Sequence, residues 1–323
     1  MLDGCPDIDL VHQAATASQA YEFLSRETVD IVLLDHEMPG QKGLDALPRM
    51  MELAGDAHIV MLSTHCQRGS KTAVAALSLG ATDALAKPSK AHAAAFSETL
   101  VSRLRQIGRS RRVAQPRLIQ IAFRPVPADF SVGCIAIGAS TGGIYALSSF
   151  FSALTVKPGV PILVTQHLPE PFIPYYVQQV ARMTGLPVSM AVEDEVLRPD
   201  HVYVAPGDAS LGCRKGGGLM RVSLNAGRDP ETQARPSVNH MFATVADCYG
   251  PGVLGIILTG IGRDGTAGAR RIVGSGGVVI AQDRESSVVW GMPGSVARAG
   301  LASATMRPDD IPGFLADHCG APR

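Results

Sequence analysis

The chain has 323 residues, of which 46% are hydrophobic and 18% are charged, with 29 basic and 29 acidic side chains. This length allows two domains, the composition is that of a soluble globular protein, and the balanced charge argues against nucleic acid as a partner. No apolar run approaches the roughly 20 residues that cross a bilayer, which excludes membrane insertion. The N-terminus lacks a secretory signal, so we expect a cytoplasmic protein. The six widely spaced cysteines predict neither a metal site nor a disulfide.

Residues 1–92 alternate short apolar runs with helical patterns, which predicts a parallel sheet covered by helices. Buried strands are expected at residues 30–34, 58–63 and 81–86. They end beside Asp35, Ser63 and Lys87, respectively. Because open α/β sheets gather functional groups at the carboxyl ends of their strands, an acid, a hydroxyl and an ammonium should meet there.

This first domain resembles the receiver domain of two-component response regulators. The resemblance rests on Leu33-Leu-Asp35-His-Glu-Met-Pro-Gly40, on Ser63 and on Lys87-Pro88. It implies that Asp35 accepts a phosphoryl group, that Ser63 is the switch hydroxyl, and that Lys87 pairs with the acceptor. A nearby ammonium and hydroxyl are suited to hold the new dianion.

One departure from the receiver pattern concerns the start of the chain. Receivers begin with a strand that ends in paired acidic residues, which bind Mg²⁺ beside the acceptor, and this sequence contains no such strand. Residues 1–8 resemble the connection after the first helix, and residues 9–15 resemble the family's second strand. We therefore expect an N-terminally truncated receiver rather than a degenerate one. Mg²⁺ would lose most of its ligands, so phosphorylation should be impaired and no metal site is predicted.

Residues 93–130 read as a basic helix and linker. From Arg103 to Arg124 there are seven arginines and no acidic residue, and the later prolines discourage regular structure. Residues 91–107 can continue as the last helix of the first domain. The arginines are solvated in a plain linker, or they bind an acidic partner surface.

The second domain, residues 131–317, keeps the alternation of strands and helices and predicts a doubly wound, mostly parallel α/β fold. Residues 219–224, which follow three glycines, are expected to form one arm of a hairpin. The core strands are expected at residues 132–137, 161–166, 202–205, 253–258 and 277–281.

Three chemically useful residues follow strands of this domain. Ser140 lies in Gly138-x-Ser140-x-Gly142, a spacing that suits a hydroxyl on a tight turn into the helix expected at residues 144–154. Such a turn can carry a nucleophile, or it can bind phosphate through its backbone N–H groups. His167 and Asp264 follow the strands at 161–166 and 253–258, so the three side chains can meet at one edge as nucleophile, base and orienting acid.

Residues 131–315 resemble the catalytic domain of the chemotaxis protein-glutamate methylesterases, a family in which a receiver domain precedes the catalytic domain. The resemblance implies Ser140 as nucleophile, His167 as general base and Asp264 as its orienting acid. It also assigns support of the turn and of the oxyanion to Thr141, Gly142, Gly143 and Ile261. The matching segments are Ile137–Gly143, Thr165–Pro169, Tyr203–Gly207, Arg235–Val238, Leu258–Gly265 and Ser287–Pro293.

The implied function is hydrolysis of glutamate γ-methyl esters on methyl-accepting chemoreceptors, with deamidation of receptor glutamines. No cofactor is expected for catalysis. The implied partners are the cytoplasmic domains of the receptors and a chemotaxis histidine kinase, whose phosphorylation of Asp35 would relieve an obstruction of the active site. The alternative is a non-catalytic response-regulator adaptor that binds a phosphate or nucleotide at the Gly138–Gly143 turn.

Overall fold

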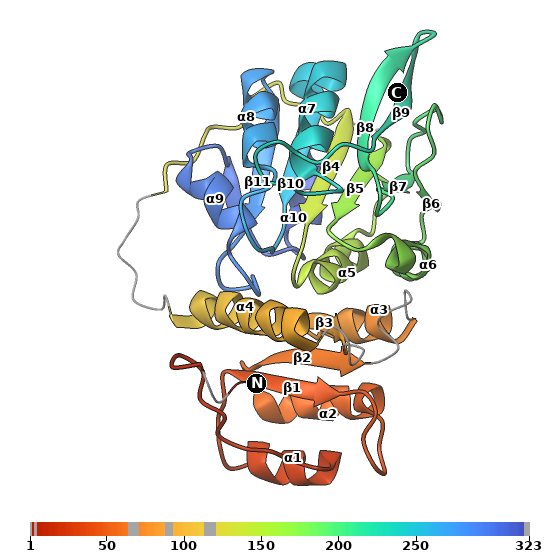
Figure 1. Cartoon of the computed structure of the whole chain (residues 1–323). Coiled ribbons are helices and arrows are strands. Elements are labelled where there is room, and N and C mark those ends of the chain that lie inside the picture. Colours follow the sequence, from red (N-terminus) through yellow and green to blue (C-terminus); the bar gives the residue numbers. More distant parts are fainter. Residues whose placement is uncertain (1, 3–4, 64–70, 88–92, 113–120, 320–323) are drawn as a thin grey trace. The chain divides into compact units, whose positions relative to one another are not determined.

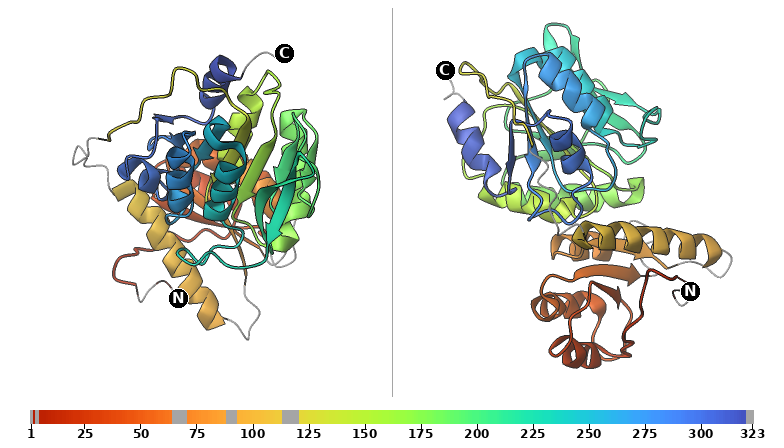
Figure 2. Two further views of the ribbon diagram at one scale, coloured as in Figure 1. Left: turned by 90° about the horizontal axis from the view of Figure 1, so that it is seen from above. Right: turned by 90° about the vertical axis from the view of Figure 1, so that its left-hand side faces the viewer.

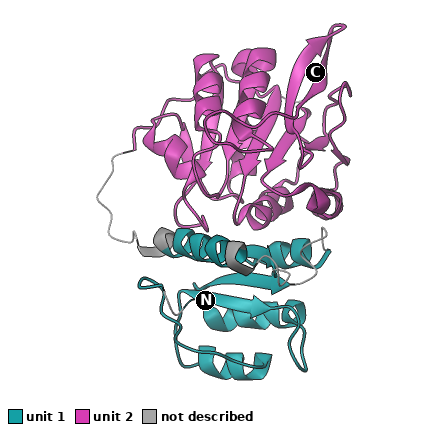
Figure 3. Cartoon of the chain, in the orientation of Figure 1, with its two compact units in different colours: residues 1–117 teal, residues 118–323 magenta. Residues whose placement is uncertain are grey.

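The computed structural model describes residues 2, 5–63, 71–87, 93–112 and 121–319. The chain divides into two compact units, residues 1–117 and 118–323 (Figure 3). Some residues named in the sequence analysis lie outside the described ranges. These are Cys66, Pro88 and residues 113–120 of the linker.

The first unit is a three-stranded parallel sheet with helices between its strands, as the sequence predicts. The strand order is β1-β2-β3, and residue Asp35 at the end of β1 is paired with Leu62 of β2. Along the chain the elements are α1 (Ala17–Leu24), β1 (Ile31–Asp35), α2 (Gly43–Ala54), β2 (His58–Ser63), α3 (Lys71–Ser78), β3 (Asp83–Ala86) and α4 (Ala93–Arg112) (Figure 1).

The core of the first unit lies between the sheet and helices α1 and α2. Leu34 and Met61 of the strands are buried in one cluster with Leu47 and Met50 of α2 and with Leu24 of α1. These apolar positions recur at helical spacing along α2, which explains why this face packs on the sheet.

The strand expected at residues 9–15 is absent, and this prediction was wrong. Residues 8–14 carry no regular structure, and Leu10 and Val11 are 42% and 59% exposed. A strand forms only where a neighbour completes its ladder of hydrogen bonds. The described residues before Ile31 contain no strand, so the segment has no partner there with which to form a ladder.

The second unit contains a seven-stranded parallel sheet of order β12-β11-β10-β4-β5-β7-β6. Its elements are β4 (Cys134–Ala139), α5 (Gly143–Ala153), β5 (Ile162–Gln166), η3 (Glu170–Phe172), α6 (Ile173–Thr184), β6 (Val188–Met190), β7 (Val202–Val204), β8 (Ser210–Gly216), β9 (Leu219–Asn225), α7 (Val238–Tyr249), η4 (Gly250–Gly252), β10 (Val253–Ile257), α8 (Thr266–Gly274), β11 (Val278–Gln282), α9 (Met292–Arg298), β12 (Ala304–Met306) and α10 (Ile311–His318) (Figure 1 and Figure 2).

The strand order confirms the doubly wound fold. From β4 the chain winds outward through β5 on one side, and it later returns to pair β10 with the other side of β4. The topological switch point therefore lies between β4 and β10, and ligands of such sheets bind beyond the carboxyl ends of the strands at this point.

The five predicted core strands and the predicted hairpin arm are all present. Strand β9 pairs antiparallel with β8, and the register Gly216↔Leu219 leaves a two-residue turn of Gly217 and Gly218. Both glycines have positive φ, as such a hairpin turn requires. The short strands β6 and β12, and the arm β8, were not predicted.

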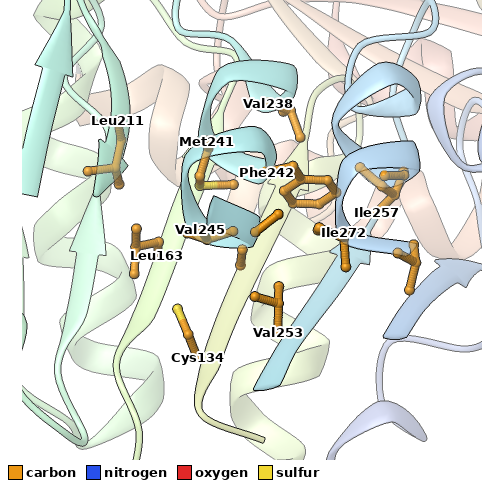
Figure 4. Packing of buried hydrophobic residues seen from close by; sticks show 14 of the residues in the cluster. Cys134, Leu163, Leu211, Val238, Met241, Phe242, Val245, Val253, Ile257 and Ile272 are labelled. Atoms are coloured by element: carbon orange, nitrogen blue, oxygen red, sulfur yellow. The ribbon is translucent and has the colours of Figure 1, made fainter. Parts of the chain in front are cut away.

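Helices α7 and α8 lie side by side over one face of the sheet. Met241, Phe242 and Val245 of α7 are fully buried, in one cluster with Cys134 of β4 and Val253 of β10, and the Phe242 ring lies beside Ile257 and Ile272 (Figure 4). This packing fixes the height of α7 over the sheet, and with it the position of the N-terminus of α7 at the switch point. No helix in the part of the chain that is described is long and apolar enough to span a membrane.

We expect Phe242→Ala to destabilise the second unit by about 3–5 kcal/mol, because it removes a fully buried ring from the centre of this core. Trp290, the single tryptophan, lies in the second unit, so its fluorescence during urea unfolding reports on that unit. Val156→Ala is the control, since Val156 is 67% exposed and its loss should change the free energy of unfolding by less than about 0.5 kcal/mol. A similar cost for both variants would contradict the described core.

Candidate active site

Ser140 stands directly after β4, on a turn that leads into α5. Its N–H donates to the Thr259 carbonyl at 3.0 Å, and its carbonyl accepts from Gln166 Nε2 at 2.8 Å. Both neighbouring strands, β10 and β5, thus hold the backbone of Ser140 in place. The side chain is half-buried.

The glycines of this turn are needed because other parts of the chain occupy the space that a side chain would fill. A Cβ on Gly142, which has φ +77°, would lie 2.6 Å from Val288, and a Cβ on Gly143 would meet the side-chain amide of Gln166. A Cβ on Gly138 would meet the side chain of Val238 at the N-terminus of α7. The turn is therefore closely packed by the protein itself.

His167 follows β5 and continues its pairing with β4, since its N–H donates to the Ala139 carbonyl at 2.9 Å. Ala139 and Gln166 are partners in the register of the two strands, so Ser140 and His167 are the next residues along each. His167 Nε2 lies 2.8 Å from Asp264 Oδ2. Because a carboxylate only accepts, this contact assigns the ring proton to Nε2 and leaves the lone pair on Nδ1.

The Asp264 carboxylate is buried against the N-terminus of α7. Oδ2 accepts from Val238 N at 2.8 Å as well as from His167, and Oδ1 accepts from Asn239 N at 3.0 Å and Gly265 N at 2.9 Å. The side chain is only 3% exposed. Backbone N–H groups and the positive end of the helix dipole compensate for the loss of water around the charge.

The structure therefore brings together the three residues that the sequence singled out. His167 and Asp264 are hydrogen-bonded, and Ser140 lies beside His167 in the strand register. Among the hydrogen bonds found within the described residues, none joins the Ser140 hydroxyl to His167. In ligand-free active sites such contacts tighten when substrate binds.

Two of the residues expected to support the turn and the oxyanion are also located. Thr141 is buried, and its carbonyl accepts a hydrogen bond from Thr259 Oγ1 at 3.0 Å. Ile261 is half-buried in the loop after β10.

Sequence reasoning missed a second carboxylate behind the site. Ser237, the N-cap of α7, donates to Asp229 Oδ2 at 3.1 Å and lies 3.4 Å from Asp264 Oδ1. Burial acts to raise the pKa of Asp229, but hydrogen bonds from Thr232, Ser237 and Glu231 outweigh it and hold that pKa below its usual value. A serine before an apolar helical run was a visible capping signal for Ser237. No local pattern indicates Asp229.

A hollow of about 240 Å³ lies beside Asp229 and the N-terminal end of α7. Asp229, Ser237 and Asn239 line it, but Ser140, His167 and Asp264 do not. The hollow therefore lies behind the helix terminus, whereas the three chemically useful residues lie at the edge of the sheet.

In the first unit, Asp35, Ser63 and Lys87 also come together. Lys87 Nζ lies 2.5 Å from Asp35 Oδ2, and Lys87 N donates to the Ser63 carbonyl at 3.1 Å. Ser63 is fully buried at the end of β2. The acid and the ammonium thus meet at the carboxyl edge of this sheet, and Ser63 lies at the end of the neighbouring strand, where its backbone contacts Lys87.

The fold and the two sites define an α/β protein in which a receiver-like unit precedes a doubly wound unit with serine, histidine and aspartate at its switch point. Residues 135–315 match the family model of the CheB methylesterase, and residues 4–95 match that of the response regulator receiver domain. The chain belongs to the CheB methylesterase family.

Individual relatives agree with this assignment. Protein-glutamate methylesterase/protein-glutamine glutaminase 2 of Caulobacter vibrioides is 38% identical over 94% of this chain and 89% of that protein. Protein-glutamate methylesterase/protein-glutamine glutaminase 1 of Rhodospirillum rubrum is 34% identical over 98% of this chain and 89% of that protein. The solved CheB methylesterase catalytic domain of Thermotoga maritima is 34% identical and covers 58% of this chain and 98% of its own, with a TM-score of 0.55.

The surroundings of Asp35 do not fit a magnesium ion. Asp35 Oδ1 accepts from Glu37 N at 2.9 Å, and Oδ2 already pairs with Lys87. Within the described residues there is no group of three side chains that could bind a metal. Mg²⁺ takes oxygen ligands in octahedral geometry, and without the paired acids of the receiver pattern Asp35 leaves most of that set to water and phosphate oxygens.

We expect Ser237→Ala to destabilise the second unit by about 1–3 kcal/mol, because α7 loses its N-cap and the buried Asp229 loses a donor. Urea unfolding followed by Trp290 fluorescence measures the cost. Ser152→Ala is the matched control, since Ser152 is exposed and its hydroxyl should contribute within about 0.5 kcal/mol. If Ser237→Ala unfolded like Ser152→Ala, the network around Asp264 would be wrongly assigned.

Proposed function

We propose that this chain hydrolyses glutamate γ-methyl esters, and deamidates glutamines, on the cytoplasmic domains of methyl-accepting chemoreceptors. The names of its relatives state these two activities for those proteins. The observation that carries the proposal is the buried 2.8 Å contact between His167 Nε2 and Asp264, beside Ser140 at the switch point. Such a substrate places the enzyme in the cytoplasm.

In the proposed reaction, Ser140 Oγ attacks the ester carbonyl while His167 Nδ1 takes its proton. Asp264 keeps the ring oriented and stabilises the imidazolium. The C–O bond to the methoxy group then breaks, the imidazolium protonates that oxygen, and methanol departs from an acyl-enzyme. His167 next deprotonates a water molecule, whose attack releases the glutamate carboxylate and returns the proton to Ser140.

The tetrahedral intermediate carries an oxyanion that needs donors. We assign this role to the backbone N–H groups of Thr141, Gly142 and Ile261, where the N-terminus of α5 adds a positive dipole. Gly143 supports the turn instead, since its N–H donates to the Ser140 carbonyl at 2.8 Å. A glutamine amide passes through the same oxyanion, with ammonia as the leaving group. No cofactor takes part in these steps.

The alternative function, an adaptor that binds phosphate at the Gly138–Gly143 turn, has less support. A phosphate-binding loop needs glycines so that the ligand can approach the backbone. Here Val238, Val288 and Gln166 occupy the spaces beside Gly138, Gly142 and Gly143. The packing favours a turn built to present the Ser140 side chain.

For the first unit we propose that Asp35 is the phosphoacceptor, with Ser63 and Lys87 as the switch hydroxyl and the paired ammonium, and a chemotaxis histidine kinase as donor. The 2.5 Å contact of Lys87 with Asp35 supports this assignment. The lack of fit to Mg²⁺ supports the further expectation that phosphorylation of this chain is impaired.

Ser140→Ala should lower methanol release from methylated receptors by at least about 10³-fold, because the nucleophile is lost while the oxyanion donors remain. The free energy of unfolding should hardly change. Ser149→Ala is the control, since Ser149 lies on α5, the helix that follows the Ser140 turn, and its hydroxyl donates to the Tyr145 carbonyl of the same helix. Activity retained in Ser140→Ala would refute the proposed triad.

Acetyl phosphate with Mg²⁺ should leave the esterase activity of this chain unchanged, because Asp35 lacks the paired acids that bind the metal. Methanol release is measured with and without the phosphodonor, and Asp35→Ala serves as the control. A rise in activity that Asp35→Ala removes would show that the switch works.

A further inference from the structure

Three cysteines of the second unit lie together although they are far apart in the sequence. Cys134 is on β4, Cys213 is on β8 and Cys248 is in the last turn of α7, and all three belong to or pack against one core cluster. Cys134 and Cys213 are 0% and 4% exposed, whereas Cys248 is half-buried. Solvent therefore reaches Cys248 but hardly reaches the other two.

The contacts of Thr244 place Cys213 beside Cys248. Cys213 N donates to Thr244 Oγ1 at 3.2 Å, and the Cys213 thiol donates to the Thr244 carbonyl at 3.5 Å. Cys248 is one helical turn after Thr244, and helical side chains tilt toward the N-terminus, so its thiol covers the same turn. The Thr244 carbonyl, which the Cys213 thiol contacts, faces Cys248 along the helix, so the two side chains are neighbours, close enough for a hydrogen bond between their thiols.

The surroundings make the two thiols chemically different. The hydrogen bond from Cys213 holds the pKa of the Cys248 thiol below its usual value, and the ammonium of Lys215 lowers it further, while partial burial and Asp247 act in the opposite direction. The same hydrogen bond, together with burial, raises the pKa of Cys213. Cys248, which is also the more exposed of the two, is therefore the thiol that loses its proton more readily and the attacking group, with Cys213 as its neighbour.

We propose that Cys248 and Cys213 form a peroxide-sensitive thiol pair that closes to a disulfide. The Cys248 thiolate attacks the outer oxygen of a hydroperoxide, the O–O bond breaks, and a Cys248 sulfenic acid forms as the alcohol or water leaves. The Cys213 thiol then attacks the sulfenic sulfur, so that the S–S bond forms, the S–O bond breaks and water is released. Two thiols are oxidised and one hydroperoxide is reduced.

The disulfide would join β8 to the end of α7. The segment between the two cysteines contains Asp229 and Ser237, and the N-terminus of α7 binds Asp264. The new bond would therefore close a loop around the residues that position Asp264. The chemistry of the pair does not depend on the esterase activity.

The test treats the full-length protein with one equivalent of hydrogen peroxide at pH 7.5, blocks the remaining thiols with iodoacetamide, and maps the peptides by mass spectrometry. We expect a Cys213–Cys248 cross-link as the main product. In Cys213→Ser, dimedone should label Cys248 as a sulfenic acid, and in Cys248→Ser, Cys213 should remain a thiol. A main product at Cys5 or Cys319, a disulfide to Cys134, or over-oxidation of Cys248 without a cross-link would overturn the proposal.

A second measurement needs no variant and so stands even if a substitution impairs folding. At pH 7.5, iodoacetamide should alkylate Cys248 of the unmodified protein at least about 5-fold faster than Cys319, since the pKa of the Cys248 thiol is lowered and that of the Cys319 thiol is raised. Cys319 is the matched control, because it is also half-buried, but burial raises the pKa of its thiol to about 11. Equal rates at the two cysteines would contradict the assignment of Cys248 as the reactive thiol.

Discussion

The second unit depends on how one buried carboxylate is compensated. Asp264 is 3% exposed, and an isolated charge there would be strongly unfavourable. Two N–H groups at the start of α7, one from Gly265 and one from the His167 ring complete its hydrogen bonds. The same contacts that make the charge tolerable also fix the helix terminus and orient the imidazole. Stability and the proposed chemistry thus rest on the same hydrogen bonds.

The sheet supplies the rest of the arrangement. Because β4 lies between β5 and β10, the residues after these strands are neighbours, and Ser140 receives a hydrogen bond from one side and donates one to the other. The glycines after β4 let Val288 and Gln166 pack against the turn and limit its movement. The core under α7, with Phe242 at its centre, fixes the height at which the helix terminus meets Asp264. The proposed nucleophile, base and acid are therefore held by elements far apart in the sequence.

Much of the fold and of the candidate site was predictable from the sequence, because buried parallel strands are short apolar runs and functional groups follow their ends. That rule found Ser140, His167 and Asp264, which the structure brings together, although their catalytic roles stay a prediction. The resemblance to the receiver family failed at residues 9–15, where the expected strand has no neighbour to pair with. Sequence reasoning also missed Asp229 and the pairing of Cys213 with Cys248, since both depend on how a loop and a hairpin return to α7. Local patterns carry no information on such contacts.

The state of the His167 ring tests the central claim most directly. In protein labelled with ¹⁵N-histidine, NMR across a pH titration should show that the neutral form of the ring carries its proton on Nε2, with that proton strongly shifted by its hydrogen bond to Asp264. Asp264→Asn should remove this shift. A ring protonated on Nδ1, or a spectrum that Asp264→Asn leaves unchanged, would contradict the account.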